Sequence, residues 1–156
     1  MEITQQADYA VRTILELALR PEDEHIASDE IARAQNIPPA FLTKICARLA
    51  AAGICVTQRG IKGGIKLGRP ASAICLLDVI EAIDGPITFN RCVRHPDDCT
   101  RERTCVVHPI WLDLCREFRT RLASYTFEQI AQRARMSPLP QRTITLYEEL
   151  PIRKTH

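Results

Sequence analysis

The chain has 156 residues, of which 46% are apolar and 26% charged, as in a soluble globular protein with one domain or one domain and an appendage. The net charge is only +2, but residues 31–77 hold no Asp or Glu and seven Lys or Arg, which leaves −5 for the rest. No apolar stretch approaches the roughly 20 residues that span a membrane, and the N-terminus does not read as a secretory signal. We therefore expect a cytoplasmic protein with reduced thiols and no membrane contact.

Three helical patterns occupy the first part of the chain. Thr4 is suited to cap a first helix, whose apolar residues recur every three or four positions. Ser28 is suited to cap a second, short helix. A third helix should begin at Pro38 or Pro39 and end at Gly53, with a face of small residues and hydrogen-bond donors that can approach another surface closely.

After Gly53 the apolar period changes to two, which predicts a hairpin with a glycine-rich basic tip at residues 59–64. Three helices and a basic hairpin indicate a winged helix-turn-helix, with the third helix in the major groove of DNA and the wing on neighbouring backbone or minor groove. Without this scaffold, the basic run would equally suit a solvated face. The side chains expected to contact double-stranded DNA are the base readers Thr43 and Lys44, the wing residues Arg59 and Lys62, and the phosphate contacts Arg48 and Lys66.

Two amphipathic helices follow the wing, one between Ser72 and Gly85 and a long one that opens with Pro109, and a short helix over residues 126–135 is possible after them. The long helix is a natural dimerisation element. We therefore expect a mainly α fold with a small β-wing, assembled as a homodimer. Its parts are a DNA-binding domain over residues 1–85, a cysteine-rich loop over 86–108, a dimerisation helix and short following helix over 109–135, and a C-terminal tail over 136–156.

The loop before the long helix holds Cys92, Cys99 and Cys105, with His108 directly behind them. Crowded thiolates repel one another, and a metal ion or an iron–sulfur cluster makes such crowding favourable. The chain has no CxxC pair, and the wide gaps of six and five residues suit a group larger than one ion. Zinc and redox-active or unligated cysteines remain the alternatives. The other four cysteines are expected mainly to pack.

Several segments together are specific: ADYAVR at residues 7–12, QRGIKGGIKLGRPA at 58–71, LLDVIEAIDGP at 76–86, and the three-cysteine loop. Through them, residues 1–134 resemble the family of iron–sulfur winged-helix regulators that includes IscR, NsrR and RirA. The resemblance implies a homodimer that reads a palindromic operator, with a cluster ligated by Cys92, Cys99 and Cys105.

The resemblance also implies a fourth ligand, for which there are two candidates. IscR-like proteins complete a 2Fe–2S site with a histidine three residues beyond the last cysteine, which is His108 here. NsrR-like proteins complete a 4Fe–4S site with an aspartate in helix one of the other subunit, which would be Asp8 of the partner subunit. Plainer roles are an ion pair of Asp8 with Arg12 and a capping or exposed position for His108. The wide first gap is closer to RirA, and we favour 4Fe–4S with Asp8.

These expectations describe a cluster-dependent transcriptional regulator, a repressor, that senses redox state, nitric oxide, or the supply of iron or clusters. The alternative is a winged-helix regulator switched by zinc, by thiol oxidation or by a bound partner protein. An enzyme is the least favoured class, because the sequence contains no nucleophile–base set and no phosphate-binding motif. No small-molecule substrate is expected.

Overall fold

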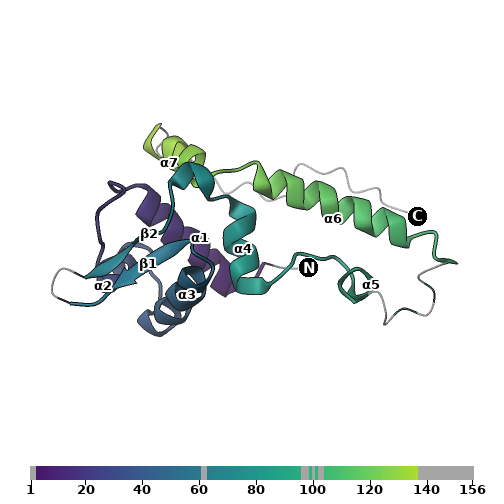
Figure 1. Cartoon of the computed structure of the whole chain (residues 1–156), viewed down its shortest axis with the longest axis horizontal. Helices are drawn as coiled ribbons and strands as arrows, with labels where there is room; N and C mark the ends of the chain where they lie inside the picture. Colours follow the sequence, from purple (N-terminus) through teal and green to yellow (C-terminus); the bar gives the residue numbers. More distant parts are fainter. Residues whose placement is uncertain (1–2, 61–62, 96–98, 100, 102–103, 137–156) are drawn as a thin grey trace, which may run out of the picture.

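The computed structural model describes residues 3–60, 63–95, 99, 101 and 104–136 (Figure 1). The expected Lys62 and the tail from residue 137 therefore lie outside the described residues. The elements follow in the order α1 (Gln5–Ala18), α2 (Ser28–Ala34), α3 (Pro39–Ala51), β1 (Cys55–Gln58), β2 (Gly64–Leu67), the 3-10 turn η1 (Ala71–Ala73), α4 (Leu76–Asp84), α5 (Arg91–Arg94), α6 (His108–Ala123) and α7 (Phe127–Met136). The expected mainly helical fold with a small antiparallel wing is confirmed.

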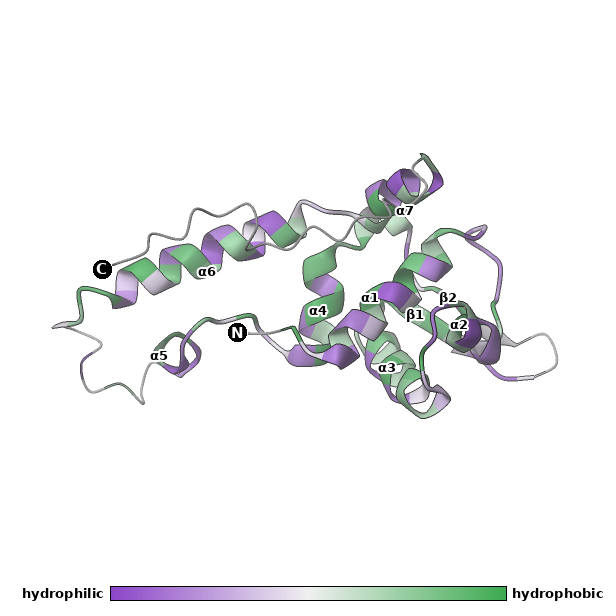
Figure 2. Ribbon diagram, turned by 180° about the vertical axis from the view of Figure 1, so that it is seen from behind, coloured by the Kyte–Doolittle hydropathy of each residue, from purple (hydrophilic) through white to green (hydrophobic). Residues whose placement is uncertain are grey.

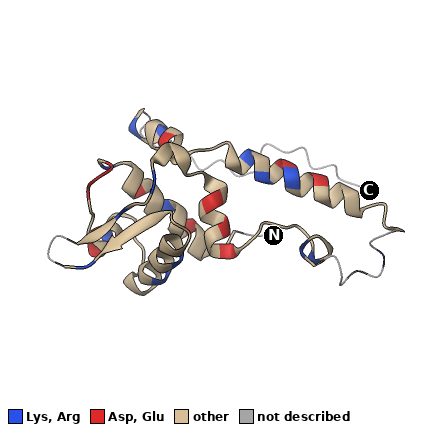
Figure 3. Ribbon diagram, viewed as in Figure 1, with Lys and Arg blue, Asp and Glu red and all other residues tan. Residues whose placement is uncertain are grey.

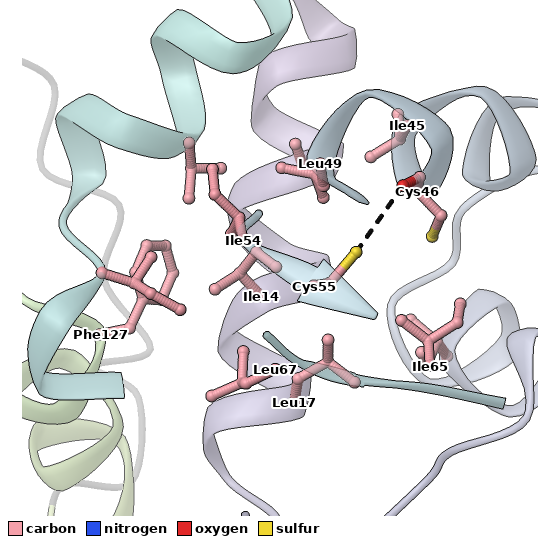
Figure 4. Close-up of a cluster of buried hydrophobic side chains, with 14 of the residues drawn as sticks. Ile14, Leu17, Ile45, Cys46, Leu49, Ile54, Cys55, Ile65, Leu67 and Phe127 are labelled. Carbon is pink, nitrogen blue, oxygen red and sulfur yellow. Dashed lines mark hydrogen bonds between the residues drawn. The ribbon is translucent and has the colours of Figure 1, made fainter. Parts of the chain in front are cut away.

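Helix α1 lies at the centre of the core, in contact with α3, α4 and α7. Its start is fixed as expected, because the Thr4 side chain accepts a hydrogen bond from the Ala7 backbone N–H at 3.2 Å. Its apolar stripe, which includes Ile14 and Leu17, is buried in one cluster with side chains that follow it in the chain. Figure 4 labels several of these partners: Ile45, Leu49, Ile54, Ile65, Leu67 and Phe127. One continuous core thus joins the DNA-binding unit to the last described helix.

The wing is a two-stranded hairpin in which Cys55 pairs with Leu67 and Gln58 with Gly64. Ile26 extends the sheet by an isolated bridge to Ile65, with backbone N–O distances of 3.0 and 2.8 Å. A Cβ atom at Gly64 would lie only 2.6 Å from the Ile26 carbonyl oxygen, so a glycine is needed for this approach. The bridge also explains why Ser28 does not cap α2 as expected. Residue 26 is held extended, Ala27 is the boundary residue, and Ser28 is already helical.

Helix α6 and the short helix α5 form an arm that extends away from the compact helical unit (Figure 1). Figure 2 shows apolar residues along α6 as well as in the core. Several large apolar side chains at the start of the arm are exposed: Val106, Val107, Ile110, Leu112 and Leu114. No helix in the described part of the chain is both long and apolar enough to span a membrane.

Candidate nucleic-acid interface and metal centre

The outer face of α3 carries small and hydrogen-bonding side chains. Pro39 starts the helix, and Leu42, Ile45 and Leu49 turn inward into the core, which leaves the opposite face in solvent. Thr43 and Lys44 are both exposed on that face, as predicted for base readers, and Ala47 beside them leaves room for a close approach. The basic residues of this helix are visible in Figure 3.

A hollow of about 640 Å³ separates α3 from the wing. One wall is lined by Thr43, Cys46 and Ala47 of α3. The other wall is lined by Arg59 and the glycines of the wing. Arg59 is exposed at the end of the described first strand, where it can reach a phosphate. The structure therefore brings one predicted base reader, Thr43, and one predicted wing contact, Arg59, to opposite walls of a single hollow, while Lys44 lies outside its lining.

The two predicted phosphate contacts have partners within the protein. Arg48 Nη1 donates a 2.7 Å hydrogen bond to the backbone carbonyl oxygen of Ile83 in the last turn of α4. Lys66 Nζ lies 3.4 Å from a carboxylate oxygen of Asp23, whose side chain is fully exposed. An exposed ion pair of this kind contributes little stability, so Lys66 can exchange it for a phosphate. Arg48, by contrast, joins the third helix to α4.

Asp8 lies in the first turn of α1 and forms the ion pair with Arg12, at 2.7 Å between oxygen and nitrogen. Both side chains are 47% exposed, so the carboxylate is accessible. The plainer role weighed for Asp8 is therefore present within one subunit. A ligand role would require Asp8 to leave Arg12 for a group bound to the other subunit.

The cysteine loop supplies free thiols and one buried imidazole. Cys92 on α5, Cys99 and Cys105 are half-buried, and none forms a disulfide. His108 is only 8% exposed at the start of α6, and its buried Nδ1 has no hydrogen-bond partner among the described residues. The plainer role considered for His108, a capping or exposed position, therefore does not describe its place in the structure. A buried nitrogen without a partner is costly, and coordination would offset that cost.

Within the described ranges, no three His, Cys, Asp or Glu side chains lie close enough to share one metal ion. The donor set nevertheless fits an iron–sulfur cluster in its chemistry, because three unpaired thiols and an unpartnered imidazole nitrogen belong to one segment. Zinc accepts the same donors. Binding would require the loop to bring its thiols together.

Contacts with α6 hold the entrance of the cysteine loop. The Phe89 backbone N–H donates to the Cys115 sulfur at 3.4 Å, and the Phe89 ring packs against Phe118 with centroids 5.7 Å apart. The Asn90 amide oxygen can accept from Trp111 Nε1 at 2.9 Å. Cys115 thus packs beside the loop. Cys92 follows Asn90 by two residues, so it lies directly after a segment that is held on α6.

Sequence reasoning did not identify the contacts that the acidic residues of α4 make. Asp78, Glu81 and Asp84 are the charged residues of this helix, and all three have partners in other elements or in adjoining turns. Their spacing of three residues on an amphipathic helix was the available signal, since it places them along one side. The partners themselves follow only from the tertiary arrangement.

Comparisons with known proteins agree with this architecture. Residues 3–133 match the Rrf2 family, which is described as an iron-dependent transcriptional regulator. A helix-turn-helix transcriptional regulator of Mycobacterium tuberculosis is 31% identical over 149 residues, which cover 96% of this chain and 90% of the relative. The transcriptional regulator IscR of Yersinia pseudotuberculosis is 31% identical over 130 residues, which cover 83% of this chain and 79% of the relative.

Among solved structures, CymR, the global cysteine regulator of Bacillus subtilis, superposes with a TM-score of 0.68 at 25% identity and covers 85% of this chain and 97% of its own. The relatives are named as transcriptional regulators, so the chain is a transcriptional regulator and not an enzyme. With its winged helix, its wing glycines and the match over residues 3–133, the chain belongs to the Rrf2 family of transcriptional regulators.

Proposed function

We propose that this regulator is a cytoplasmic homodimeric repressor whose affinity for a palindromic operator depends on an iron–sulfur cluster held by the cysteine loop. The observation that carries the proposal is the combination of Cys92, Cys99 and Cys105 as free thiols with the buried, unpartnered Nδ1 of His108. The match to a family described as iron-dependent supports it. In this proposal residues 1–85 bind DNA, 86–108 sense, and 109–135 dimerise.

The DNA-binding step uses the exposed face of α3 and the wing. Thr43 and Lys44 would meet base edges in the major groove, while Arg59, Lys62 and Lys66 neutralise phosphates beside it. Two copies would read half-sites about one helical turn, roughly 34 Å, apart. Because that spacing is fixed by the DNA, a small change in the distance between two recognition helices alters affinity strongly.

The exposed apolar face of α6 supports the homodimer. Val107, Ile110 and Leu114 are between 42% and 55% exposed, and a shallow hollow of about 420 Å³ beside them is lined by Phe89, Trp111 and Phe118. Apolar surface of this kind is stabilised by burial, and a second copy of α6 offers a matching face. The arm would then hold the two DNA-binding units at a defined distance.

A bound cluster supplies a group that oxygen, nitric oxide or iron scarcity can alter or remove. The chain's own part is to bind it with three thiolates and a fourth ligand and to report the position of the loop to α6. Asp8 of the partner subunit remains the fourth ligand that the sequence favours, for a 4Fe–4S cluster. The unpartnered His108 Nδ1 supports the alternative, a 2Fe–2S cluster.

A second candidate is a winged-helix regulator that is switched by zinc, by thiol oxidation or by a bound partner protein. The structural similarity to a global cysteine regulator supports this second candidate. Both candidates share the DNA-binding unit and differ in the event that switches it.

Purification without oxygen, followed by visible absorption and counts of iron and sulfide per subunit, decides between the candidates. The proposal predicts a coloured protein with about four of each, or about two of each if the cluster is 2Fe–2S. Loss of colour in Asp8→Ala but not in His108→Ala would assign the fourth ligand to Asp8, and the reverse would assign it to His108. A colourless wild-type protein with zinc, or with no metal, contradicts the cluster.

A further inference from the structure

The last turn of α4, residues 81–84, makes polar contacts with parts of the chain that are far apart in sequence. Figure 1 shows α4 between the compact helical unit and the arm. Buried Val79, Ile80 and Ile83 anchor this helix in the core, which makes it a firm support. We refer to residues 81–84 and their polar contacts as the α4 junction.

Glu81 connects the junction to the arm. One of its carboxylate oxygens, Oε1, accepts a 2.9 Å hydrogen bond from the Ile87 backbone N–H, at the start of the segment that leads into the cysteine loop. The same oxygen forms an ion pair with Arg119 of α6. The Glu81 side chain is only 22% exposed, so these charge-assisted contacts are partly shielded from water. One carboxylate therefore contacts both α6 and the segment that leads into the cysteine loop.

Ile83 and Asp84 connect the junction to the DNA-binding unit. The Ile83 carbonyl oxygen accepts the 2.7 Å hydrogen bond from Arg48 of α3. The Asp84 carboxylate accepts from Thr4, at 2.6 Å from its hydroxyl and 3.1 Å from its backbone N–H, and Thr4 caps the helix that carries Asp8. One helical turn therefore contacts the arm, the first helix and the recognition helix.

From these contacts we infer that the α4 junction transmits displacements of the cysteine loop and α6 to the recognition helix, with Glu81 and Arg48 as its positioning residues. The inference rests on the proposed function, because that function makes the cysteine loop the sensing segment. It also changes the role of Arg48, which acts through α4 on the orientation of α3 rather than as a phosphate contact.

The physical basis is a short and continuous path. Glu81 and Ile83 lie in the same helical turn, so a movement of Glu81 moves the carbonyl group that Arg48 holds. Packed helices shift as units rather than deform continuously. Coupling along such a path is demonstrated only by its response when one contact is removed.

Hydrogen exchange of the cluster-free protein, read by mass spectrometry, tests the inference without operator DNA and without the cluster. The variant is Glu81→Ala, which removes both polar contacts of the carboxylate, to Ile87 and to Arg119. Neither of these two contacts involves a residue of α3. We expect exchange of residues 39–51 to rise about fivefold relative to the wild type, while residues 28–34 of α2 stay unchanged.

Three variants serve as controls. Glu81→Gln keeps an oxygen for the Ile87 N–H and should restore part of the protection of α3. Asp113→Asn removes an exposed 2.7 Å ion pair with Arg116 on α6, outside the junction, and should leave α3 unchanged. In an Arg48→Met background, Glu81→Ala should add nothing further to the exchange of α3.

Exchange that rises only in residues 85–95, or equally in α2 and α3, overturns the inference. If Glu81→Ala disrupts folding, Arg119→Gln removes the ion pair from its other partner, and the same comparison applies. Since all samples are free of a cluster, failure to bind iron would refute the proposed function and leave this result standing.

Discussion

Two buried thiols lie between the recognition helix and the wing. Cys46 is 4% and Cys55 2% exposed, and the Cys55 thiol donates to the Cys46 carbonyl oxygen at 3.7 Å (Figure 4). Burial raises the pKa of Cys46 to about 11 and that of Cys55 to about 12. Both thiols are therefore protonated at neutral pH and pack as small apolar side chains.

This pair makes the free energy of unfolding depend on pH in the alkaline range. Below the ordinary thiol pKa of 9.0 both the folded and the unfolded chain hold these protons, so the stabilisation is complete. Between pH 9 and 12 the unfolded chain loses them first, so the free energy of unfolding falls, by roughly 1–3 kcal/mol per thiol. Denaturant unfolding at pH 8 and 10.5 measures this fall. A Cys46→Ala, Cys55→Ala double variant should show a smaller fall, and an equal fall would contradict the assignment.

Arg48 and Lys44 are neighbouring cations on α3 with different partners. Lys44 is exposed, whereas Arg48 donates to Ile83. A random-sequence duplex offers Lys44 no matched base, but its charge still displaces a counterion in the groove, so Lys44→Met should lower the slope of log Kd against log salt by about one. Arg48→Met should change that slope less and lower the free energy of unfolding by about 1 kcal/mol. An equal loss of slope in both variants would restore Arg48 as a phosphate contact.

At this scale, local interactions were predictable and long-range ones were not. The Thr4 cap, the Asp8–Arg12 pair and the burial of Cys46 follow from spacing of three or four residues along one helix. The partner of Arg48 is 35 residues away on another helix, and no periodicity encodes that approach. The burial of His108 likewise depends on how α6 packs.

Among the elements, the described helices and strands begin and end near the predicted proline, glycine and capping positions. Helix α5 was not expected, because four residues inside a loop show no apolar period. The bridge of Ile26 to the wing was also missed, since it pairs one residue outside any strand pattern. Short elements of this kind are decided by tertiary contacts rather than by propensity.

That bridge leads to a prediction about the wing. Gly64→Ala would place a methyl group 2.6 Å from the Ile26 carbonyl oxygen, so the strand must move. Gly53→Ala is the matched comparison, because Gly53 has a φ of +68° but no atom within 4 Å of the place that its added methyl group would occupy. We expect Gly53→Ala to cost about 1–2 kcal/mol of stability and Gly64→Ala to cost more and to weaken DNA binding. Equal unfolding free energies and DNA affinities in the two variants would refute the close contact.

For the whole molecule, the proposed function requires two copies that are joined through the arm. Ile110 is 55% exposed on the apolar face of α6, so Ile110→Glu should introduce a charge into the proposed dimer interface. Sedimentation should then show a monomer with weakened operator binding. Met136→Glu, at an 86% exposed position on α7, should remain a dimer. A dimeric Ile110→Glu protein would place the interface elsewhere.

The ligand set of the cysteine loop is the feature least accessible to sequence reasoning. The winged helix could be predicted because its helices, turn glycines and basic hairpin follow one another in the chain. Residue type and spacing make the cysteine loop a candidate ligand-binding segment but do not fix its fourth ligand, since Asp8 would come from a second copy and the state of His108 depends on local packing.

In the proposed function, the state of the cysteine loop sets operator affinity. The most direct test compares the Kd of one operator, selected from random duplexes by the purified protein, for cluster-loaded and cluster-free samples at fixed salt, with Cys99→Ser as the control. The proposed function predicts that loading changes the wild-type Kd by on the order of tenfold or more, with no change in the Cys99→Ser sample. Equal affinities of the loaded and cluster-free wild type would contradict it.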